Sequence, residues 1–247
     1  MAAIEYREND IVGQETLEVI SSARKFNDWM YRTIRPFCKG KILEIGSGIG
    51  NISVNFLNDG YSITLSDVRS HYYDFLKNKF SSCSNLEAVL MIDLVNDEFD
   101  TVYAGYLEKY DSLVALNVIE HIENDRLAIH NCKKLIKPGG TIIILAPAYQ
   151  HLYNRFDKEL SHYRRYDKKL LQKLFNEENL KLIESKYFNF MGIPGWYISG
   201  KLQMNKSIPR SQMKFYDKLV PVFKVIDKLV FNKIGLSVIT IGKKDLN

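Results

Sequence analysis

The chain of 247 residues is 46% hydrophobic and 26% charged, which excludes a low-complexity or disordered protein and suffices for one α/β domain with a sizeable core. The net charge of +5 is mixed in sign along the chain, so nucleic acid is not an expected partner, whereas an anionic substrate is compatible with it. Three widely spaced cysteines without a CxxC pair, no secretion-signal pattern and no apolar run of membrane-spanning length predict a cytoplasmic protein with free thiols.

Hydrophobic periodicity predicts helices and strands that alternate along the chain. Residues 14–36 form the first predicted helix, which Pro36 ends. Further helices are predicted at 51–57, 71–80, 125–136 and 168–177, and strands at 41–45, 61–65, 87–92, 112–116, 141–145, 182–188 and 236–242. The Lys-Pro-Gly-Gly sequence at 137–140 predicts a turn. Alternation of this kind, with strands that are apolar throughout, is typical of a parallel sheet covered by helices on both faces.

Two long segments, residues 147–166 and 189–235, interrupt this alternation, and such segments are usually lids or binding loops. In the second segment Trp196 and Tyr197 predict either an aromatic lid or an irregular packed loop. This aromatic pair is flanked by Gly192, Pro194, Gly195 and Gly200.

A basic amphipathic helix is predicted over residues 212–231, broken or kinked at Pro221. Its apolar stripe comprises Phe215, Leu219, Val222, Ile226 and Leu229, and the opposite side carries Lys214, Lys218, Lys224 and Lys228. Such a helix can make peripheral contact with an anionic membrane surface, form a dimer face or cap its own domain. We favour the cap, because wide apolar stripes usually belong to a core.

Three glycines, Gly46, Gly48 and Gly50, lie between the first predicted strand and the helix that follows it. A dinucleotide-binding G-x-G-x-x-G loop would place the third glycine one residue later. Glu44 precedes this loop, and a carboxylate there would oppose a pyrophosphate but would suit a ligand with positive charge. The alternative is a tight strand-to-helix turn without a ligand.

Two further acids end the next predicted strands. An acid in the place of Asp67 accepts hydrogen bonds from ribose hydroxyls in doubly wound nucleotide-binding folds. Asp93 could accept from an exocyclic amine, while the next backbone N–H faces a ring nitrogen. Each could instead cap a helix or turn. Because ligands of such folds bind at the carboxyl ends of the strands, the three acids together indicate a nucleoside crevice.

The motifs E-I-G-S-G-I-G, S-D-V at Asp67, M-I-D-L, L-N-V-I-E-H-I-E-N-D and L-I-K-P-G-G-T-I-I-I-L-A-P occur in this order. Over residues 14–190 the chain thereby resembles the class I S-adenosylmethionine-dependent methyltransferases. The resemblance implies a Rossmann-like doubly wound seven-stranded sheet with an antiparallel last strand, an N-terminal helix and a helical insertion before the last strand. We expect one domain over residues 1–247, divided into an N-terminal helical cap (1–40), a cofactor-binding core (41–189), a lid or substrate insertion (190–235) and the last strand (236–247).

The resemblance also implies S-adenosylmethionine as cofactor. The glycines would line its methionine and ribose parts, Glu44 would lie near its cationic end, and Asp67 would bind the ribose. Asp93 and the Leu94 backbone would face the adenine, and Asn117 and Ile119 the sulfonium side. The full set of expected cofactor contacts is Glu44, Gly46, Ser47, Gly48, Gly50, Asn51, Asp67, Val68, Asp93, Leu94, Asn117 and Ile119.

The acceptor side is expected around Glu120, His121 and His162. The sequence after the fourth strand is not the N-P-P-Y type of enzymes that methylate base amines in DNA. A similar E-x-x-E-H pattern with a later histidine binds a divalent metal in small-RNA 2′-O-methyltransferases and occurs in ubiquinone-pathway O-methyltransferases. Here Asn117 replaces the first glutamate. We therefore favour His121 or His162 as general base, or as pocket wall, over a metal site formed with Glu120.

Arg164 and Arg165 suggest an acceptor with a phosphate or carboxylate group, because guanidinium groups bind such anions well. The equal alternative is that an arginine pairs with Asp157 or Asp167 and fixes the loop. The loop at 147–166 also resembles methyltransferases found with glycosyltransferases in glycan pathways.

The sequence thus predicts O-methylation of a small molecule, a sugar or a glycan- or lipid-linked acceptor. A metal-assisted enzyme of the RNA-terminal or quinone type and a nucleoside-binding module without catalysis are the alternatives.

Overall fold

The computed structural model describes residues 11–199 and 208–246 and contains a seven-stranded sheet with the order β3-β2-β1-β4-β5-β7-β6. All neighbouring strands pair in parallel except β7, which is antiparallel to both β5 and β6. The predicted Rossmann-like doubly wound sheet with an antiparallel last strand is confirmed. The strands are β1 (Ile42–Ile45), β2 (Ile63–Ser66), β3 (Leu86–Leu90), β4 (Tyr110–Leu116), β5 (Ile136–Pro147), β6 (Leu180–Phe188) and β7 (Ser237–Lys244).

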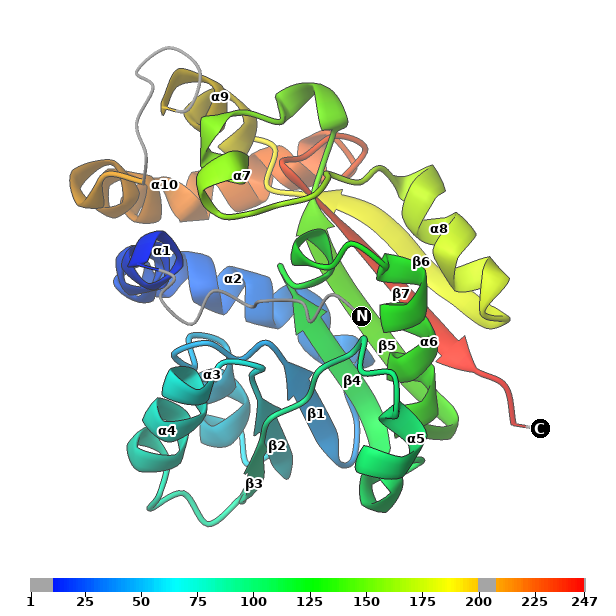
Figure 1. The fold of residues 1–247 in the computed structure, drawn as a ribbon. Coiled ribbons are helices and arrows are strands. Elements are labelled where there is room, and N and C mark those ends of the chain that lie inside the picture. The colour runs from blue at the N-terminus through cyan, green and yellow to red at the C-terminus, as the bar shows by residue number, and fades with distance from the viewer. Residues whose placement is uncertain (1–10, 200–207, 247) are drawn as a thin grey trace.

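Helices lie on both sides of this sheet. They are α1 (Ile11–Ser21), α2 (Arg24–Ile34), α3 (Ser53–Asn58), α4 (Ser70–Lys79), α5 (Phe99–Val102), α6 (Asp125–Leu135), α7 (Arg155–Glu159), α8 (Lys168–Glu177), α9 (Gly192–Tyr197) and α10 (Arg210–Leu229). Figure 1 shows α7, α9 and α10 at the top of the view, α1 and α2 below them, and β1 to β3 at the bottom. None of the helices in the described ranges combines the length and the hydropathy needed to cross a membrane.

The inner strands of the sheet are largely buried on both faces because alternate residues supply two separate cores, whereas the edge strands β3 and β6 are partly exposed. In β4, Leu113 packs into a cluster with residues of α6 and α8, whereas its neighbour Val114 packs into a cluster with residues of α2, α3 and α10. This double burial explains why the strands are apolar without alternation.

The predicted helix at 14–36 is wrong as a single element, because the chain forms α1 and α2 with a break at residues 22–23. Backbone and side-chain donors both bind the carbonyl groups at the break. The Ser22 and Ala23 N–H groups donate to the Val19 and Ile20 carbonyls at 3.3 and 2.9 Å. The Ser22 hydroxyl donates to the Val19 carbonyl at 2.7 Å, and the Asn27 amide donates to the Ile20 carbonyl at 2.9 Å. Helix ends need such partners, so a short polar stretch can end a helix despite continuous apolar periodicity.

The predicted turn at residues 137–140 is also wrong as a separate element, because these residues belong to β5. The pairing of β4 with β5 shifts register here, since Tyr110 pairs with Ile136 but Ser112 pairs with Thr141. The extra residues of β5 form an irregularity at this point of the strand. The Lys137 ammonium group in this stretch donates to the Asp111 carboxylate of β4 at 2.9 Å.

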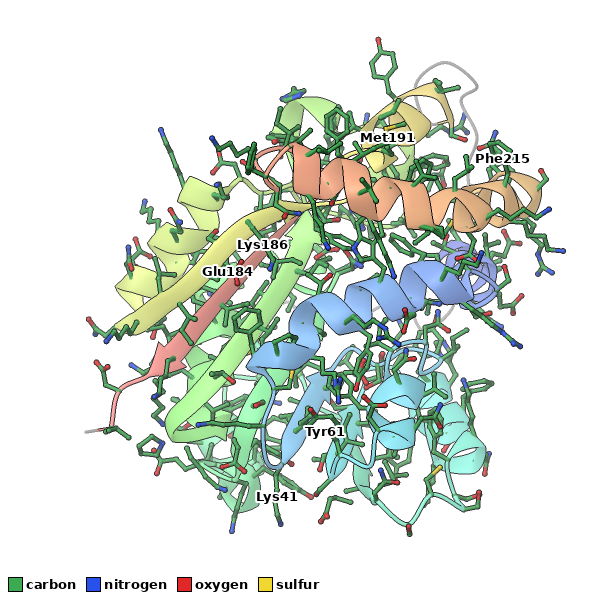
Figure 2. The ribbon with its side chains drawn as sticks, turned by 180° about the vertical axis from the view of Figure 1, so that it is seen from behind. Lys41, Tyr61, Glu184, Lys186, Met191 and Phe215 are labelled. Atoms are coloured by element: carbon green, nitrogen blue, oxygen red, sulfur yellow. The ribbon has the colours of Figure 1, made fainter. Side chains whose placement is uncertain are left out.

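Helix α10 continues through Pro221, so the predicted break is wrong, whereas the alternative of a kink stays a prediction. Val220 and Phe223 are buried on either side of the proline and hold both halves of the helix against the core. Figure 2 shows this helix from behind, running along the outside of the molecule beside α2. The predicted apolar stripe does not form a single buried face, because Phe215, Val222 and Leu229 are exposed. Gly200 of the predicted aromatic segment lies outside the described residues.

A buried acid joins α10 to the end of β6. The Asp227 carboxylate accepts hydrogen bonds from the Asn189 N–H at 2.7 Å and the Phe190 N–H at 2.8 Å, and burial raises its pKa. It therefore satisfies two backbone donors at the point where the chain leaves the sheet.

We expect Asp227→Ala to lower the free energy of unfolding by about 1–3 kcal/mol, because it leaves buried N–H groups without an acceptor. Chemical denaturation would measure this change. Asp74→Ala, at an exposed position of α4, is the matched control and should change stability by less than about 0.5 kcal/mol. Equal stabilities of the two variants would contradict the anchoring role of Asp227.

Candidate active site

A cavity of about 900 Å³ lies at the carboxyl ends of β1, β2 and β4. Its size is at the upper end of the range of about 300–1,000 Å³ that is usual for ligand sites. The loop after β1 forms one wall, and the segment after β5 forms another. Residues of α1, α2, α9 and α10, including Leu17, Met30, Trp196 and Met213, also line it. The cavity therefore has the location at which ligands bind in open α/β sheets.

The loop after β1 has the backbone conformation that requires glycine. Gly48 and Gly50 have φ angles of +53° and +78°, in the left-handed region that other residues rarely adopt. A Cβ atom at Gly50 would lie 2.5 Å from the Phe80 ring, and one at Gly48 would lie 2.9 Å from the Leu17 side chain of α1. The glycines thus allow both the tight turn and the close approach of α1 and α4.

Glu44, at the end of β1, lines the cavity although it is almost fully buried. Burial raises the pKa of its carboxyl group to about 7, partly offset by hydrogen bonds from Ser53 and Ser47. The nearby Asp67 charge raises the pKa further. A ligand with positive charge would favour the ionised form of Glu44.

Asp67, at the end of β2, joins this strand to the glycine loop. Its carboxylate accepts from the Gly48 N–H at 3.0 Å and from the Arg69 N–H at 3.1 Å. Burial raises the pKa of Asp67, and these two hydrogen bonds oppose that effect. Since a carboxylate offers about four lone-pair positions, the group that binds the loop retains capacity for a ligand.

Most of the residues expected to contact the cofactor line this cavity. They are Glu44, Gly46, Ser47, Gly48, Asn51, Asp67, Val68, Leu94 and Asn117. Gly50, Asp93 and Ile119 are not among the lining residues of the described chain. Gly50 packs on α4, the Asp93 carboxylate accepts from the Val95 N–H at 2.9 Å, and Ile119 is buried in the core.

The three expected acceptor-side residues converge on one region of the cavity. The rings of His121 and His162 lie edge to face with their centroids 4.6 Å apart. Ligand atoms of Glu120, His121 and His162 all lie within 4.8 Å of one another. Both Glu120 carboxyl oxygens are buried without a hydrogen-bond partner among the described residues.

The two histidines differ in their surroundings. Burial, the neighbouring His162 and the charge of Arg69 lower the pKa of His121 to about 3, so its ring is neutral near pH 7 and is a weak base. His162 instead has a carboxylate partner, since its Nδ1 lies 2.9 Å from the Asp157 carboxylate. This contact orients the ring and places its Nδ1 in the protonated state, which leaves Nε2 as the basic nitrogen.

Asp157 is the centre of a buried ionic network. Burial acts to raise its pKa, but the contacts with His162 and Arg165 outweigh this effect and hold the pKa below its usual value. The Arg165 guanidinium donates to Asp157 at 2.8 Å and to the Ala148 carbonyl at 3.0 Å, and it lies over the Trp196 ring at 4.6 Å. Asp157 is therefore ionised and fixed in place.

Arg164 and Arg165 both bind groups of the protein itself. Arg164 donates to the Asp125 carboxylate at 2.9 Å and to the Glu123 carbonyl at 2.8 Å, while Arg165 binds Asp157. These contacts support the interpretation in which the arginines fix the loop. They give no support to an anion site at this position.

Sequence reasoning named Asp157 only as one partner for an arginine and missed its contact with His162. Asn154 and Asp157 form a capping box at the start of α7. This capping box is the sequence pattern that could have indicated a structural role for Asp157. Trp196 was predicted as a lid or packed loop. Its ring packs on Phe156 with the centroids 4.9 Å apart and lines the cavity.

Comparison with known proteins agrees with this geometry. Residues 43–142 match the family model described as a methyltransferase domain. The hybrid PKS-NRPS synthetase iliA of Neonectria sp. is 29% identical over 147 residues, which are 56% of this chain and 4% of that protein. The ubiquinone biosynthesis O-methyltransferase of Erwinia tasmaniensis is 25% identical over 115 residues, which are 47% of this chain and 45% of that protein. This chain spans less than half the length of these curated relatives.

The solved structures include a SAM-dependent methyltransferase from Archaeoglobus fulgidus with a TM-score of 0.58 and 15% identity, covering 88% of this chain and 94% of that chain. This likeness shows the shared fold. Together with the match of residues 43–142 to the methyltransferase-domain family, it supports the predicted resemblance to the class I S-adenosylmethionine-dependent methyltransferases. S-adenosylmethionine is the cofactor that this resemblance implies. The cavity beside the glycine loop, the Glu44 carboxyl group and the free lone pairs of Asp67 fit this cofactor.

The raised pKa of Glu44 predicts a pH dependence of cofactor binding. S-adenosylhomocysteine carries an amino group that pairs only with the ionised carboxylate, and below pH 7 a proton must first leave Glu44. Calorimetry should therefore show an affinity that rises up to about tenfold per pH unit as the pH approaches 7 and is constant above it. In Glu44→Gln the slope should disappear. A slope of the same size in that variant would assign the titration to another group.

Proposed function

We propose that this protein transfers the methyl group of S-adenosylmethionine to a hydroxyl oxygen of a small-molecule or lipid-linked acceptor, with His162 as general base. The observation that carries the proposal is the Asp157–His162 pair beside the same cavity that the glycine loop lines. A hydroxyl group is a poor nucleophile until its proton is removed, so a positioned base is the chemical requirement of this reaction.

The cofactor supplies an electrophilic methyl group on a sulfonium ion. The chain's own residues have two tasks. The cavity walls hold the acceptor oxygen in line with the methyl carbon and exclude water. His162 Nε2 accepts the hydroxyl proton, and the Asp157 carboxylate stabilises the imidazolium that forms. We assign cofactor binding to the lining residues of the glycine loop, Asp67, Val68, Leu94 and Asn117, with Gly50, Asp93 and Ile119 as supports behind them.

The acceptor side of the cavity favours an apolar acceptor. Its lining includes Ile20, Phe188, Trp196, Met213 and Tyr216. An acceptor with a large apolar part would bury surface against these side chains, whereas an anionic sugar would find Arg164 and Arg165 already bound to acids of the protein. We infer that residues 190–235 form the substrate insertion of a single domain. The three cysteines are free thiols, which supports a cytoplasmic location.

A metal-assisted O-methyltransferase is the second candidate. It is favoured by the unpartnered buried carboxyl group of Glu120 beside two histidines, since buried polar groups normally have partners. Glu120, His121 and His162 Nε2 would be the ligands, and a Mg²⁺ or Zn²⁺ ion would lower the pKa of a bound acceptor hydroxyl. Asp157 would then orient His162 as a ligand rather than as a base.

Replacement of His162 should affect turnover and not cofactor binding. We expect His162→Ala to lower kcat by about 10²–10⁴-fold with any acceptor found by screening with labelled cofactor, and Asp157→Asn to lower it to a smaller extent. Calorimetry with S-adenosylhomocysteine should give unchanged affinity. His151→Ala, at an exposed histidine of the same segment, is the control and should keep full activity. Equal losses of turnover and cofactor affinity in His162→Ala would mean that the residue only supports the fold.

Chelation separates the two candidates. The general-base mechanism predicts that EDTA leaves the rate unchanged. The metal candidate predicts that EDTA abolishes the rate, that Mg²⁺ or Zn²⁺ restores it, and that the metal raises the melting temperature of the wild type but not of Glu120→Gln. The melting temperature needs no acceptor, so this measurement tests the metal site independently of the reaction.

A further inference from the structure

Helix α10 has an apolar face on each side. The inner face packs against the core through Met213, Val220 and Phe223, which are buried. The outer face carries Phe215, Val222, Val225 and Leu229, whose side chains are 66%, 55%, 55% and 71% exposed. Phe231 directly after the helix is 77% exposed. We call these five residues with Lys214, Lys218 and Lys228 the outer α10 surface.

The outer α10 surface is continuous along the helix. Phe215, Val222 and Leu229 are spaced seven residues apart, so they lie on one line along the helix, and Val225 lies beside them. A helix of 20 residues is about 30 Å long, and the apolar side chains extend over most of that length. Figure 2 labels Phe215 near one end of this helix, at the outside of the molecule.

The charges of α10 are sorted between its two sides. Both acids of α10 accept hydrogen bonds from backbone groups of the protein. Asp217 accepts from the Phe26 N–H at 2.8 Å, and Asp227 accepts from the N–H groups of Asn189 and Phe190. Lys224 pairs with Asp28 of α2 at 3.5 Å. Lys214, Lys218 and Lys228 are exposed and form no ion pair within residues 11–199 and 208–246. The charged side chains of the outer α10 surface are therefore all positive.

We propose that the outer α10 surface docks the protein on an anionic lipid bilayer, with α10 parallel to the membrane plane. The apolar side chains would enter the acyl region, and the lysines would contact anionic headgroups. A second copy of the chain fits less well, because a symmetric contact through this surface would bring the lysines of both copies together.

The same helix connects this surface with the cavity. Met213 and Tyr216 of α10 line the cavity from the inside, so docking through the outer surface brings this wall of the cavity near the bilayer, with α10 between them. The docking itself does not depend on the methyl-transfer proposal and is tested without an acceptor.

Co-sedimentation of the full chain with lipid vesicles tests the docking. We expect the partition coefficient to be at least about tenfold higher for phosphatidylcholine vesicles that contain phosphatidylglycerol than for phosphatidylcholine alone, and to fall as salt is raised. The double variant Phe215→Ser/Leu229→Ser and the triple variant Lys214→Glu/Lys218→Glu/Lys228→Glu should each lose at least about tenfold. Both should keep the wild-type melting temperature, because every substituted side chain is exposed.

The controls place matched changes elsewhere on the surface. Val102→Ser on α5, where the side chain is 51% exposed, and Lys169→Glu on α8 should bind vesicles as the wild type does. The proposal is overturned if the wild type does not sediment with anionic vesicles, or if either α10 variant keeps wild-type binding. A lipid-free dimer that the Phe215→Ser/Leu229→Ser variant converts to a monomer would assign the surface to a second copy instead.

Discussion

The hydrogen bond from the Gly48 N–H to the Asp67 carboxylate holds the two walls of the crevice together. A buried carboxylate is costly unless donors surround it, and the left-handed turn of the glycine loop presents such a donor. The loop and the acid therefore depend on each other. Glu44 adds a second acid to the same small volume, and each carboxyl group has its pKa raised by burial. A ligand with a cationic end and ribose hydroxyls would satisfy both acids at once, which is why the crevice suits a nucleoside with positive charge better than a diphosphate.

The acceptor side shows how two residues of one type acquire different properties. His121 lies in surroundings that disfavour a charged ring, whereas His162 has an ionised carboxylate at its Nδ1. The carboxylate is in turn fixed by Arg165, which Trp196 covers. The orientation of His162 thus rests on a network that extends from the loop after β5 to α9.

Much of the fold follows from the sequence because a parallel sheet covered on both faces requires apolar strands, and the strands near 41–45, 112–116 and 141–145 were predicted on that basis. The helix at 168–177 has the predicted bounds, since Asp167 caps its first turn by accepting from the Leu170 N–H. The break between α1 and α2 was missed because its hydrogen bonds, from backbone N–H groups and from the Ser22 and Asn27 side chains, leave hydrophobic periodicity unchanged. For the site, the convergence of His121 and His162 was predicted because they follow two adjacent strands. The contact between Asp157 and His162 was not predicted, because it forms within an irregular loop where no periodicity relates the two residues.

The outer face of α10 shows the limit of periodicity most clearly. A pattern of apolar residues identifies a stripe, but it does not reveal which side of the helix faces the protein. In α10 the buried side includes Asp227, whose cost is offset by two backbone donors, and part of the apolar stripe faces outward. The docking proposal explains why this outward face combines aromatic and aliphatic residues with lysines. An anionic lipid bilayer has an apolar interior for the former and negatively charged headgroups for the latter. Methylation of a hydroxyl removes a hydrogen-bond donor, so the product prefers an apolar phase more than the acceptor does. If the outer α10 surface docks on a bilayer, the product of the proposed reaction would therefore stay with the membrane more readily than its acceptor.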